Sequence, residues 1–121
     1  MPYMKVSLTQ KLTDEKRTQL LEGLQNALWT IPEKKGVPVI IDLEEEKSFY
    51  ILGKKQEEFI HVDVQYFSNF KYSQKRDFTR AAFDSMHEVL GWSKEKMFLL
   101  ITERNTWGGH GDYLDEFVSE F

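Results

Sequence analysis

Hydrophobic and polar residues alternate along 3–8 at the start of the chain, a period of two that is typical of a strand. A helix is predicted next, because the hydroxyl of Thr13 suits an N-cap and the carboxylates after it suit the positive end of a helix dipole. The apolar positions of this helix recur at helical spacing; they are Leu20, Leu21, Leu24, Ala27 and Leu28. The nearly continuous apolar run 37–43 predicts a buried second strand, with Pro38 at its start or on an edge.

The same order of elements recurs in the second part of the chain. Residues 59–67 predict a strand, Ser73 is the expected N-cap of a second helix, and Gly91 is its expected end. The apolar stripe of that helix comprises Phe78, Ala81, Ala82, Ser85, Met86, Val89 and Leu90. The apolar run 97–101 predicts the last strand.

Matched positions indicate an internal repeat. Thr13 aligns with Ser73, and residues 39–41 align with 99–101, which puts the two copies sixty positions apart. The hairpins expected in the two copies are 49–53 and 107–111.

This repeat predicts a single domain, 1–121, made of two βαβ halves at about 1–58 and 59–121. Right-handed crossovers pair the two strands of each half in parallel, so both helices should cover one face of a four-stranded sheet. The predicted fold class is therefore α/β (α+β). The opposite face is expected to be apolar, and nine Phe, five Tyr and three Trp are a heavy aromatic load for this length. Because an open apolar face needs a cover, we expect another subunit there.

Composition and charge argue against several classes of protein. The formal net charge of −4 disfavours a nucleic-acid partner, because phosphates demand a clustered positive surface. No apolar run approaches the roughly 20 residues that cross a bilayer, so no membrane partner is expected and a cytoplasmic location is the default. Cysteine is absent, and His61, His87 and His110 lack the spacing of metal ligands, so neither a metal nor another cofactor is expected.

Pro2 is the first candidate for chemistry. Removal of Met1 would expose its secondary amine, and an α-amino group titrates near pH ~8. Burial beside a cation brings such a pKa towards neutrality, where a general base works best. The alternative interpretation is that Pro2 only begins a strand, where proline is tolerated.

Several short motifs follow one another in the same order in both halves. The first half contains Met1-Pro2, Thr13-Asp14-Glu15-Lys16, Val37 to Asp42 and Phe49 to Gly53, and the second half repeats the later part as Leu99 to Glu103 and Trp107 to Gly111. This combination covers nearly the whole chain and resembles the 4-oxalocrotonate tautomerase unit of the tautomerase superfamily. The fused length and three stretches look closest to the cis-3-chloroacrylic acid dehalogenases; they are Pro2-Tyr3-Met4, Lys11-Leu12-Thr13 and Gly109 to Tyr113. The resemblance implies a homotrimer with the sheets facing inward.

The resemblance also implies roles for individual residues. Pro2 would transfer a proton, and cationic side chains would hold a substrate carboxylate. Lys11 stands where the relatives place an arginine after the first strand, and Lys71 stands near another arginine, after the third strand. Both are departures, because lysine cannot form the planar bidentate clamp of arginine. Pro38 occupies a third arginine position, so that contact is lost. For each lysine, a solvated loop charge is an equally good interpretation.

Three further residues are candidates for the wall of a pocket. Phe49 and Trp107 would keep the pocket dry, although Trp107 could instead fill a subunit interface. His110 lies among glycines and close to Asp112, where it could line the mouth of the pocket or be an ordinary loop histidine.

These residues favour a tautomerase or isomerase-like enzyme in which Pro2 moves a proton on a small 2-oxo acid or its enol. A catalytically inactive superfamily member with a binding or structural role is the alternative, and the missing arginines support it. A ferredoxin-like RNA-binding domain shares the order of elements, but the acidic balance disfavours it. Dehalogenation is not expected, because Gly111 stands where a water-activating glutamate would be and the partner tyrosine has no counterpart.

Overall fold

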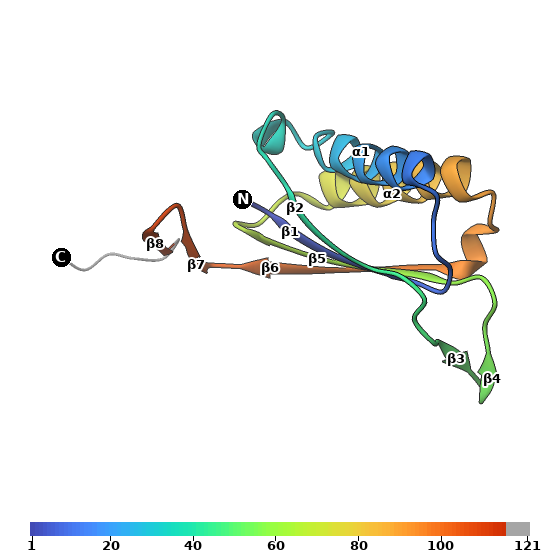
Figure 1. Ribbon diagram of the computed structural model, residues 1–121. Helices are drawn as coiled ribbons and strands as arrows, with labels where there is room; N and C mark the ends of the chain where they lie inside the picture. The colour runs from blue at the N-terminus through green and yellow to red at the C-terminus, as the bar shows by residue number, and fades with distance from the viewer. Residues whose placement is uncertain (116–121) are drawn as a thin grey trace.

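The computed structural model describes residues 1–115, which form a four-stranded sheet, two helices on one of its faces and two small hairpins (Figure 1). The first half consists of β1 (Tyr3–Leu8), α1 (Asp14–Leu28), β2 (Ile40–Glu44) and the hairpin of β3 (Tyr50–Ile51) with β4 (Lys54–Lys55). The second half consists of β5 (Ile60–Phe67), α2 (Tyr72–Leu90), β6 (Met97–Arg104) and the hairpin of β7 (Thr106–Gly109) with β8 (Asp112–Asp115). A short 3₁₀ helix precedes the second strand of each half, η1 at Pro32–Lys34 and η2 at Lys94–Lys96.

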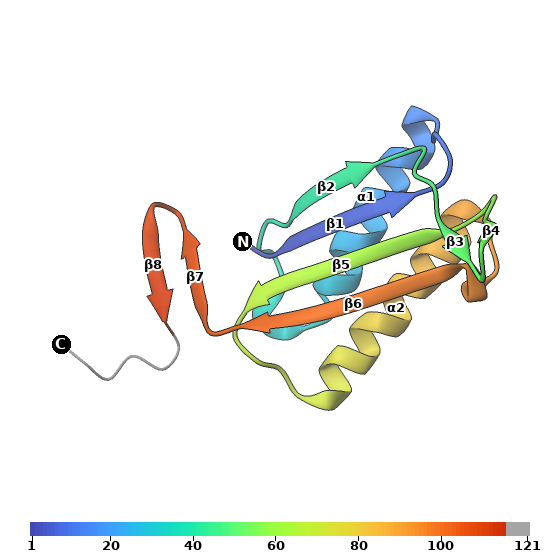
Figure 2. The same ribbon diagram turned by 90° about the horizontal axis from the view of Figure 1, so that it is seen from below.

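The sheet has the strand order β2-β1-β5-β6. Each half contributes one parallel pair, and β1 and β5 join the halves in an antiparallel pair. Tyr3 lies opposite Ile40 and Ile60 lies opposite Met97, so each crossover advances by 37 residues. The predicted architecture of two βαβ units with both helices on one face is confirmed (Figures 1 and 2).

The core lies between the sheet and the two helices. The helices bury most of the apolar stripe that their spacing predicts, although Leu21, Ala81, Ser85 and Val89 are only partly buried. The central strands bury every second side chain over most of their length. Fully buried side chains include Met4, Val6, Leu20, Leu24, Val62, Tyr66, Phe78 and Met86. Within residues 1–115, no helix combines the length and the hydropathy that a membrane span requires.

One helix starts at its predicted cap and the other does not. Thr13 is the N-cap of α1, and its hydroxyl accepts a hydrogen bond from a first-turn backbone N–H at 3.2 Å. The prediction of Ser73 as the second cap is wrong, because α2 begins at Tyr72 and Lys71 holds the cap position. The side-chain oxygen of Gln74 accepts a hydrogen bond from the Lys71 N–H at 2.9 Å. A side chain inside the helix therefore satisfies the backbone of the cap residue.

Two strands differ in length from their predictions. The strand predicted over 37–43 begins only at Ile40, since Pro38 has no N–H to donate to the sheet. The strand predicted over 97–101 continues to Arg104.

Equivalent positions of the two halves lie 58 residues apart. The N-caps Thr13 and Lys71 have this separation, and so do Leu52 and His110, which occupy the same positive-φ position in the two hairpin turns. The sixty-residue alignment of helices and strands is therefore wrong by two residues, whereas the alignment of the hairpins is correct.

The face of the sheet opposite the helices is mixed rather than apolar. Its edge strands present the exposed side chains of Ile40, Phe98 and Leu100. The two central strands present Lys5, Ser7, His61, Asp63 and Gln65, because their polar positions alternate with the buried ones. The expectation of an apolar open face therefore holds only for the edges.

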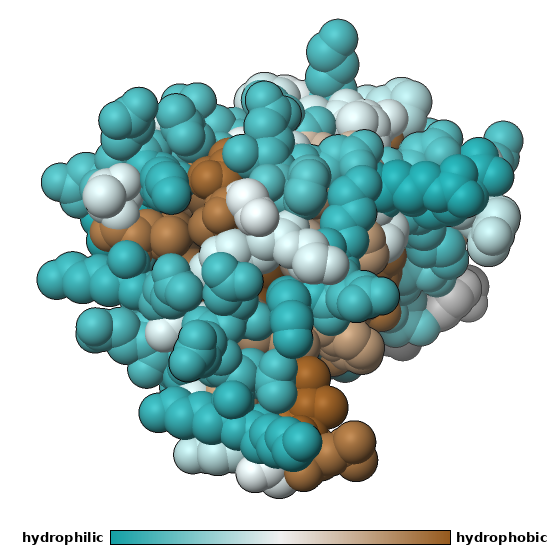
Figure 3. Space-filling view, turned by 90° about the vertical axis from the view of Figure 1, so that its right-hand side faces the viewer, coloured by the Kyte–Doolittle hydropathy of each residue, from teal (hydrophilic) through white to brown (hydrophobic). Residues whose placement is uncertain are grey.

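A second apolar surface lies on the β3–β4 hairpin. Tyr50, Ile51 and Leu52 are exposed there, and Leu52 is 97% accessible. The hairpin projects away from the body of the domain, and apolar atoms gather at this projection (Figures 1 and 3). Such an exposed apolar tip is typical of an interaction surface.

Candidate active site

The N-terminal residues lie at one end of the sheet, beside the start of the parallel neighbour β2. Pro2 is buried, and its carbonyl oxygen accepts a hydrogen bond from the Ile40 N–H at 2.9 Å. Met1, which precedes Pro2 in the chain, is 40% exposed. The backbone at Pro2 is thus held by the sheet while the preceding residue reaches a surface cavity.

That cavity has a volume of about 380 Å³, within the range of small-molecule sites. Its lining residues come from four strands and the N-terminus; they are Met1, Tyr3, Ile40, Gln65, Trp107, Gly108 and Gly109. Three of them form one row across the open face, because Ile40 and Gln65 both lie opposite Tyr3. β7 forms the other wall. Its hairpin follows β6 at the same end of the sheet as the N-terminus (Figure 2).

Polar groups at the cavity are held by neighbours on the open face. The Tyr3 hydroxyl donates a hydrogen bond to Asp42 Oδ2 at 2.8 Å. This hydrogen bond and burial raise the pKa of Tyr3, so its hydroxyl stays protonated at neutral pH. On the opposite side, Arg104 donates from Nε and Nη2 to Gln65 Oε1 at 3.4 and 3.3 Å.

A carboxylate cluster lies at the same end of the sheet, on the helix side. Glu103 accepts hydrogen bonds from the Tyr66 hydroxyl at 3.0 Å, the Phe70 N–H at 2.8 Å and Lys75 Nζ at 2.9 Å. Burial alone would raise the pKa of Glu103, but these donors outweigh it and the pKa is lowered. Burial and the bond to Glu103 raise the pKa of Tyr66. The cluster fixes the loop that leads to Lys71.

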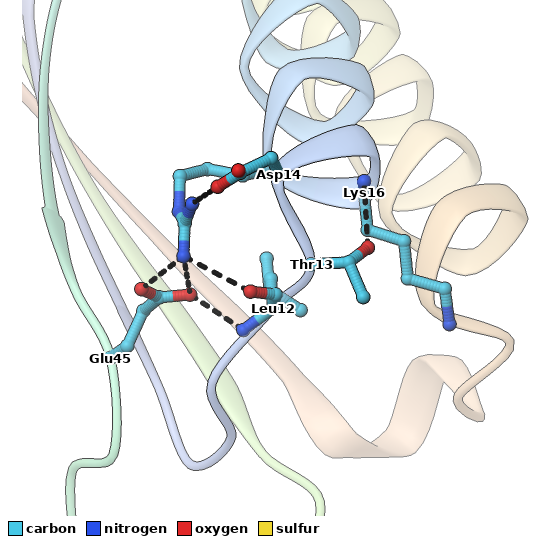
Figure 4. Close-up of polar contacts among 6 residues, drawn as sticks. Leu12, Thr13, Asp14, Lys16 and Glu45 are labelled. Carbon is cyan, nitrogen blue, oxygen red and sulfur yellow. Dashed lines mark hydrogen bonds and ion pairs between the residues drawn. The ribbon is translucent and has the colours of Figure 1, made fainter.

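The first half contains the equivalent cluster (Figure 4). Glu45 accepts hydrogen bonds from the Leu12 N–H at 2.7 Å and from Arg17 Nη2 at 2.9 Å, and Arg17 also bonds Asp14 at 2.6 Å. The pKa of Glu45 is lowered, because these donors outweigh the effect of burial. The cluster fixes the loop that carries Lys11. Each predicted substrate-binding lysine therefore lies in a loop that a partly buried carboxylate holds in place.

The structure brings some of the predicted site residues together and separates others. Trp107 lines the cavity that Met1 and its neighbour Pro2 adjoin. Lys71 lies at the same end of the sheet but is exposed, and His110 is exposed in the β7–β8 turn. Lys11 lies beyond the far end of β1, a strand of six residues that spans about 20 Å.

Phe49 is also far from Pro2 in the same chain. Its ring packs against Phe59 at 4.9 Å and lies 6.4 Å from His61, between the ring centroids. His61 stacks in turn on Phe98 at 5.7 Å. This aromatic row belongs to the end of the sheet where β3 and β4 project. Within residues 1–115, no group of three or more metal-ligating side chains could hold a metal ion.

Three residues of the site were missed by sequence reasoning. Tyr3, Gln65 and Arg104 occupy positions of β1, β5 and β6 that face away from the helices. For Tyr3 and Gln65, the alternation of polar and buried positions along the strand could have predicted that they face away from the helices. The same pattern could not have placed Arg104, because the last strand was predicted to end before it.

Comparisons with known proteins support the fold. No protein-family model and no curated protein matches the sequence. Leishmania major MIF2 matches with a TM-score of 0.83 and 16% identity, over 94% of this chain and 97% of that chain. Pt0534 inactivated by 2-oxo-3-pentynoate matches with a TM-score of 0.83 and 19% identity, over 94% and 96%. A wild-type fused 4-OT asymmetric trimer matches with a TM-score of 0.79 and 20% identity, over 91% and 94%.

These structures are members of the tautomerase superfamily, and a malonate semialdehyde decarboxylase with the same fold matches at a TM-score of 0.68. The resemblance to the tautomerase superfamily is therefore confirmed in the fold, which this chain shares along nearly its whole length.

Proposed function

We propose that this protein is an enzyme that tautomerises a small 2-oxo acid or its enol, with the amine of Pro2 as the proton-transferring group. The observation that carries the proposal is the cavity of about 380 Å³ at the N-terminus, which Met1 lines directly and Trp107 closes on the other side. Loss of Met1 would leave the secondary amine of Pro2 at this cavity.

The surroundings suit a neutral amine acting as a base. Ile40 and Trp107 are apolar walls, and the hydrogen bond from the Ile40 N–H to the Pro2 carbonyl fixes the position of the ring. Pro2 is buried, and burial disfavours the protonated amine, so we expect its pKa to fall from about 8 towards neutrality. Pro2 would take the enol O–H proton of the substrate and return a proton to the adjacent carbon.

We also propose a homotrimer, in which Lys11 and Phe49 reach the Pro2 cavity from a neighbouring chain. Three of the matched fused 4-OT structures are trimers. In this chain, both residues lie at the far end of the sheet, and the exposed β3–β4 hairpin beside Phe49 offers an apolar contact surface. Lys71 and His110 would lie at the rim of the cavity. The cytoplasmic location stays a prediction.

The decisive experiment compares three forms of the purified protein. Untagged chain should lack Met1 by intact mass and should tautomerise phenylpyruvate. Pro2→Ala should lower kcat/KM by about 100- to 10,000-fold, the usual contribution of a positioned base. The same chain with an uncleaved N-terminal extension should be as inactive, because its proline nitrogen is blocked. Activity that survives both changes would show that the base is another group.

Complete inactivity of the trimmed protein towards every enol tested would instead favour the inactive, ligand-binding alternative. The observation behind that alternative is that neither Lys11 nor Lys71 lines the cavity of its own chain. Halide release from cis-3-chloroacrylate is not expected in either case, because the turn after His110 has Gly111 and no carboxylate at the position of the water-activating glutamate.

A further inference from the structure

We propose that the side-chain amide of Gln65 donates a hydrogen bond from Nε2 to the oxygen of the reacting carbonyl group, and that Arg104 positions this amide. Gln65 is then a catalytic residue, because that oxygen carries negative charge while the proton moves. The inference rests on the proposed function, since it takes the reaction at the Pro2 cavity to pass through an enolate. It concerns the oxygen that reacts and not the carboxylate of the substrate.

Gln65 reaches the cavity from the strand that pairs with the start of the chain. It is one of the lining residues, and it lies opposite Tyr3, which directly follows Pro2. Its neighbours along β5, Val64 and Tyr66, are buried on the helix side, so the side chain of Gln65 lies on the open face. The amide and the amine of Pro2 therefore adjoin one cavity, as a reaction at two neighbouring substrate atoms requires.

The contact with Arg104 determines which end of the Gln65 amide is free. Arg104 Nε and Nη2 lie 3.4 and 3.3 Å from Gln65 Oε1, and a guanidinium can only donate hydrogen bonds. The oxygen is therefore directed towards Arg104, and the two N–H groups of Nε2 are on the other side of the amide. Within residues 1–115, Nε2 makes no hydrogen bond. A cation at Oε1 also polarises the amide, which strengthens its N–H groups as donors.

The other side chains of the cavity wall are poorer donors. The Tyr3 hydroxyl already donates to Asp42 at 2.8 Å, so it offers a ligand only its lone pairs. The indole of Trp107 has a single N–H, and Nε1 lies beside Gly109, 3.6 Å from the position that a Cβ would take there. Among the lining residues that the structure describes, Gln65 is therefore the side chain with two uncommitted N–H donors.

A neutral donor suits an oxygen whose charge changes during the reaction. When Pro2 takes the enol O–H proton, the electron pair stays on the oxygen, and the C=O bond forms again as the adjacent carbon receives a proton. A hydrogen bond to this oxygen is strongest while the oxygen is negative, so it stabilises the transition state more than the bound substrate. Loss of the donor should therefore lower kcat and leave KM nearly unchanged.

Steady-state kinetics of the trimmed protein with phenylpyruvate tests the role of Gln65. Gln65→Met keeps the length of the side chain and removes the donor, so it should lower kcat about 100-fold and change KM less than about 3-fold. Gln65→Glu keeps an oxygen for Arg104 but replaces the N–H groups with a second oxygen, and its kcat should fall at least as far. Thr102→Val is the matched control, because Thr102 lies opposite Gln65 outside the cavity lining, and it should change neither constant.

A double-mutant cycle tests the positioning role of Arg104. Arg104→Leu leaves the amide free to rotate and should lower kcat about 3- to 10-fold in the parent protein. The same substitution should have no further effect on kcat in the Gln65→Met background, because there is no amide left to position. An equal loss in both backgrounds would show that Arg104 acts independently of Gln65 and would overturn that part of the inference.

The outcomes separate this inference from the proposed function. If Gln65→Met keeps the parent kcat while Pro2→Ala loses activity, the amide does not stabilise the enolate and the proposed function stands. A loss that comes from KM alone would show that Gln65 only shapes the cavity, and would also overturn the inference. Circular dichroism checks folding, and if Gln65→Met is unfolded, Gln65→Glu decides by the same criteria. If the trimmed parent tautomerises no enol tested, both proposals are wrong.

Discussion

The two halves of this protein repeat the same framework but place different groups on it. The N-cap positions, the hairpin turns and the carboxylate clusters of the two halves lie 58 residues apart. Near the cavity, however, the equivalent residues differ in kind: Pro2, which follows the lining residue Met1, corresponds to the buried Ile60, and Arg104, which contacts the lining residue Gln65, corresponds to Glu46. Met1, Tyr3 and Ile40 line the cavity from the first half, whereas Gln65 and the β7 residues line it from the second half. The proposed base and the hairpin that faces it therefore come from different copies of the repeat.

The hairpins show the same divergence. Phe49 of the first half packs against Phe59 within its own half, while the equivalent Trp107 lines the cavity at the N-terminus. A common framework therefore does not determine where the aromatic residue of a hairpin acts. The four predictions below test how far the equivalence extends.

The largest effect should come from the carboxylate clusters. Glu103→Gln should lower the free energy of unfolding by about 1–3 kcal/mol, because it leaves the Lys75 ammonium and the other donors with a weaker acceptor. Glu45→Gln should cost less, since its cluster has no buried tyrosine. Urea unfolding monitored by circular dichroism measures both.

The pH dependence of unfolding gives an independent check on these clusters. Both glutamates have a lowered pKa in the folded state, so their stabilisation is present above the unfolded value of about 4.3 and is lost as pH falls through the folded value. Each Gln variant should therefore lose less stability on acidification than the parent. An unchanged acid slope in Glu103→Gln would contradict the assigned cluster.

A smaller effect is expected from the paired aromatic residues. Trp107→Ala should raise KM for phenylpyruvate roughly 10-fold by removing apolar contact area from the cavity wall. Phe49→Ala should raise KM only where the protein is oligomeric, because its ring is remote from Pro2 in the same chain. Steady-state kinetics over a dilution series, with the oligomeric state followed by light scattering, distinguishes the two. Equal KM effects in a monomer would show that Phe49 acts in its own chain.

The smallest effect concerns the hairpin turns. Leu52 has φ of 51° and is followed by Gly53, a turn in which asparagine is preferred to leucine. Leu52→Asn should stabilise the monomeric fold by at most about 1 kcal/mol, measured by thermal unfolding. His110→Asn is the matched change in the other half. If Leu52→Asn alone weakens the oligomer, the exposed leucine is retained for contact with a neighbouring chain.

The elements were largely predictable from the sequence, but several of their boundaries were not. The first helix started where Thr13 and the acidic first turn indicated, because those groups satisfy the backbone locally. The same reasoning gave the wrong cap at Ser73, because the side chain of Gln74, inside the helix, accepts the hydrogen bond from the N–H of the cap residue Lys71. This error of two residues also shifted the repeat alignment and hid the equivalence of Glu45 and Glu103.

The site was less predictable than the fold. Pro2 and Trp107 were predicted as site residues from their place in the motifs, and Trp107 does line the cavity. The contact of Arg104 with Gln65 depends instead on strand pairing between distant segments. The extra residues of β6 that carry Arg104 past the predicted strand end are polar or charged, so hydrophobic periodicity could not show them.

The antiparallel seam between β1 and β5 has a consequence for folding kinetics. Within each half the paired strands close a loop of 37 residues, whereas the seam pairs Leu8 with Ile60 and Tyr3 with Gln65. Loop-closure entropy rises only slowly with length, so these contacts differ by less than about 1 kcal/mol in closure cost. Loop closure therefore does not strongly favour strand pairing within one half over the other, and the β1–β5 pair can form only when both halves are present. Folding of the domain should accordingly be limited by the meeting of β1 and β5, and substitutions at the seam should slow folding more than they speed unfolding.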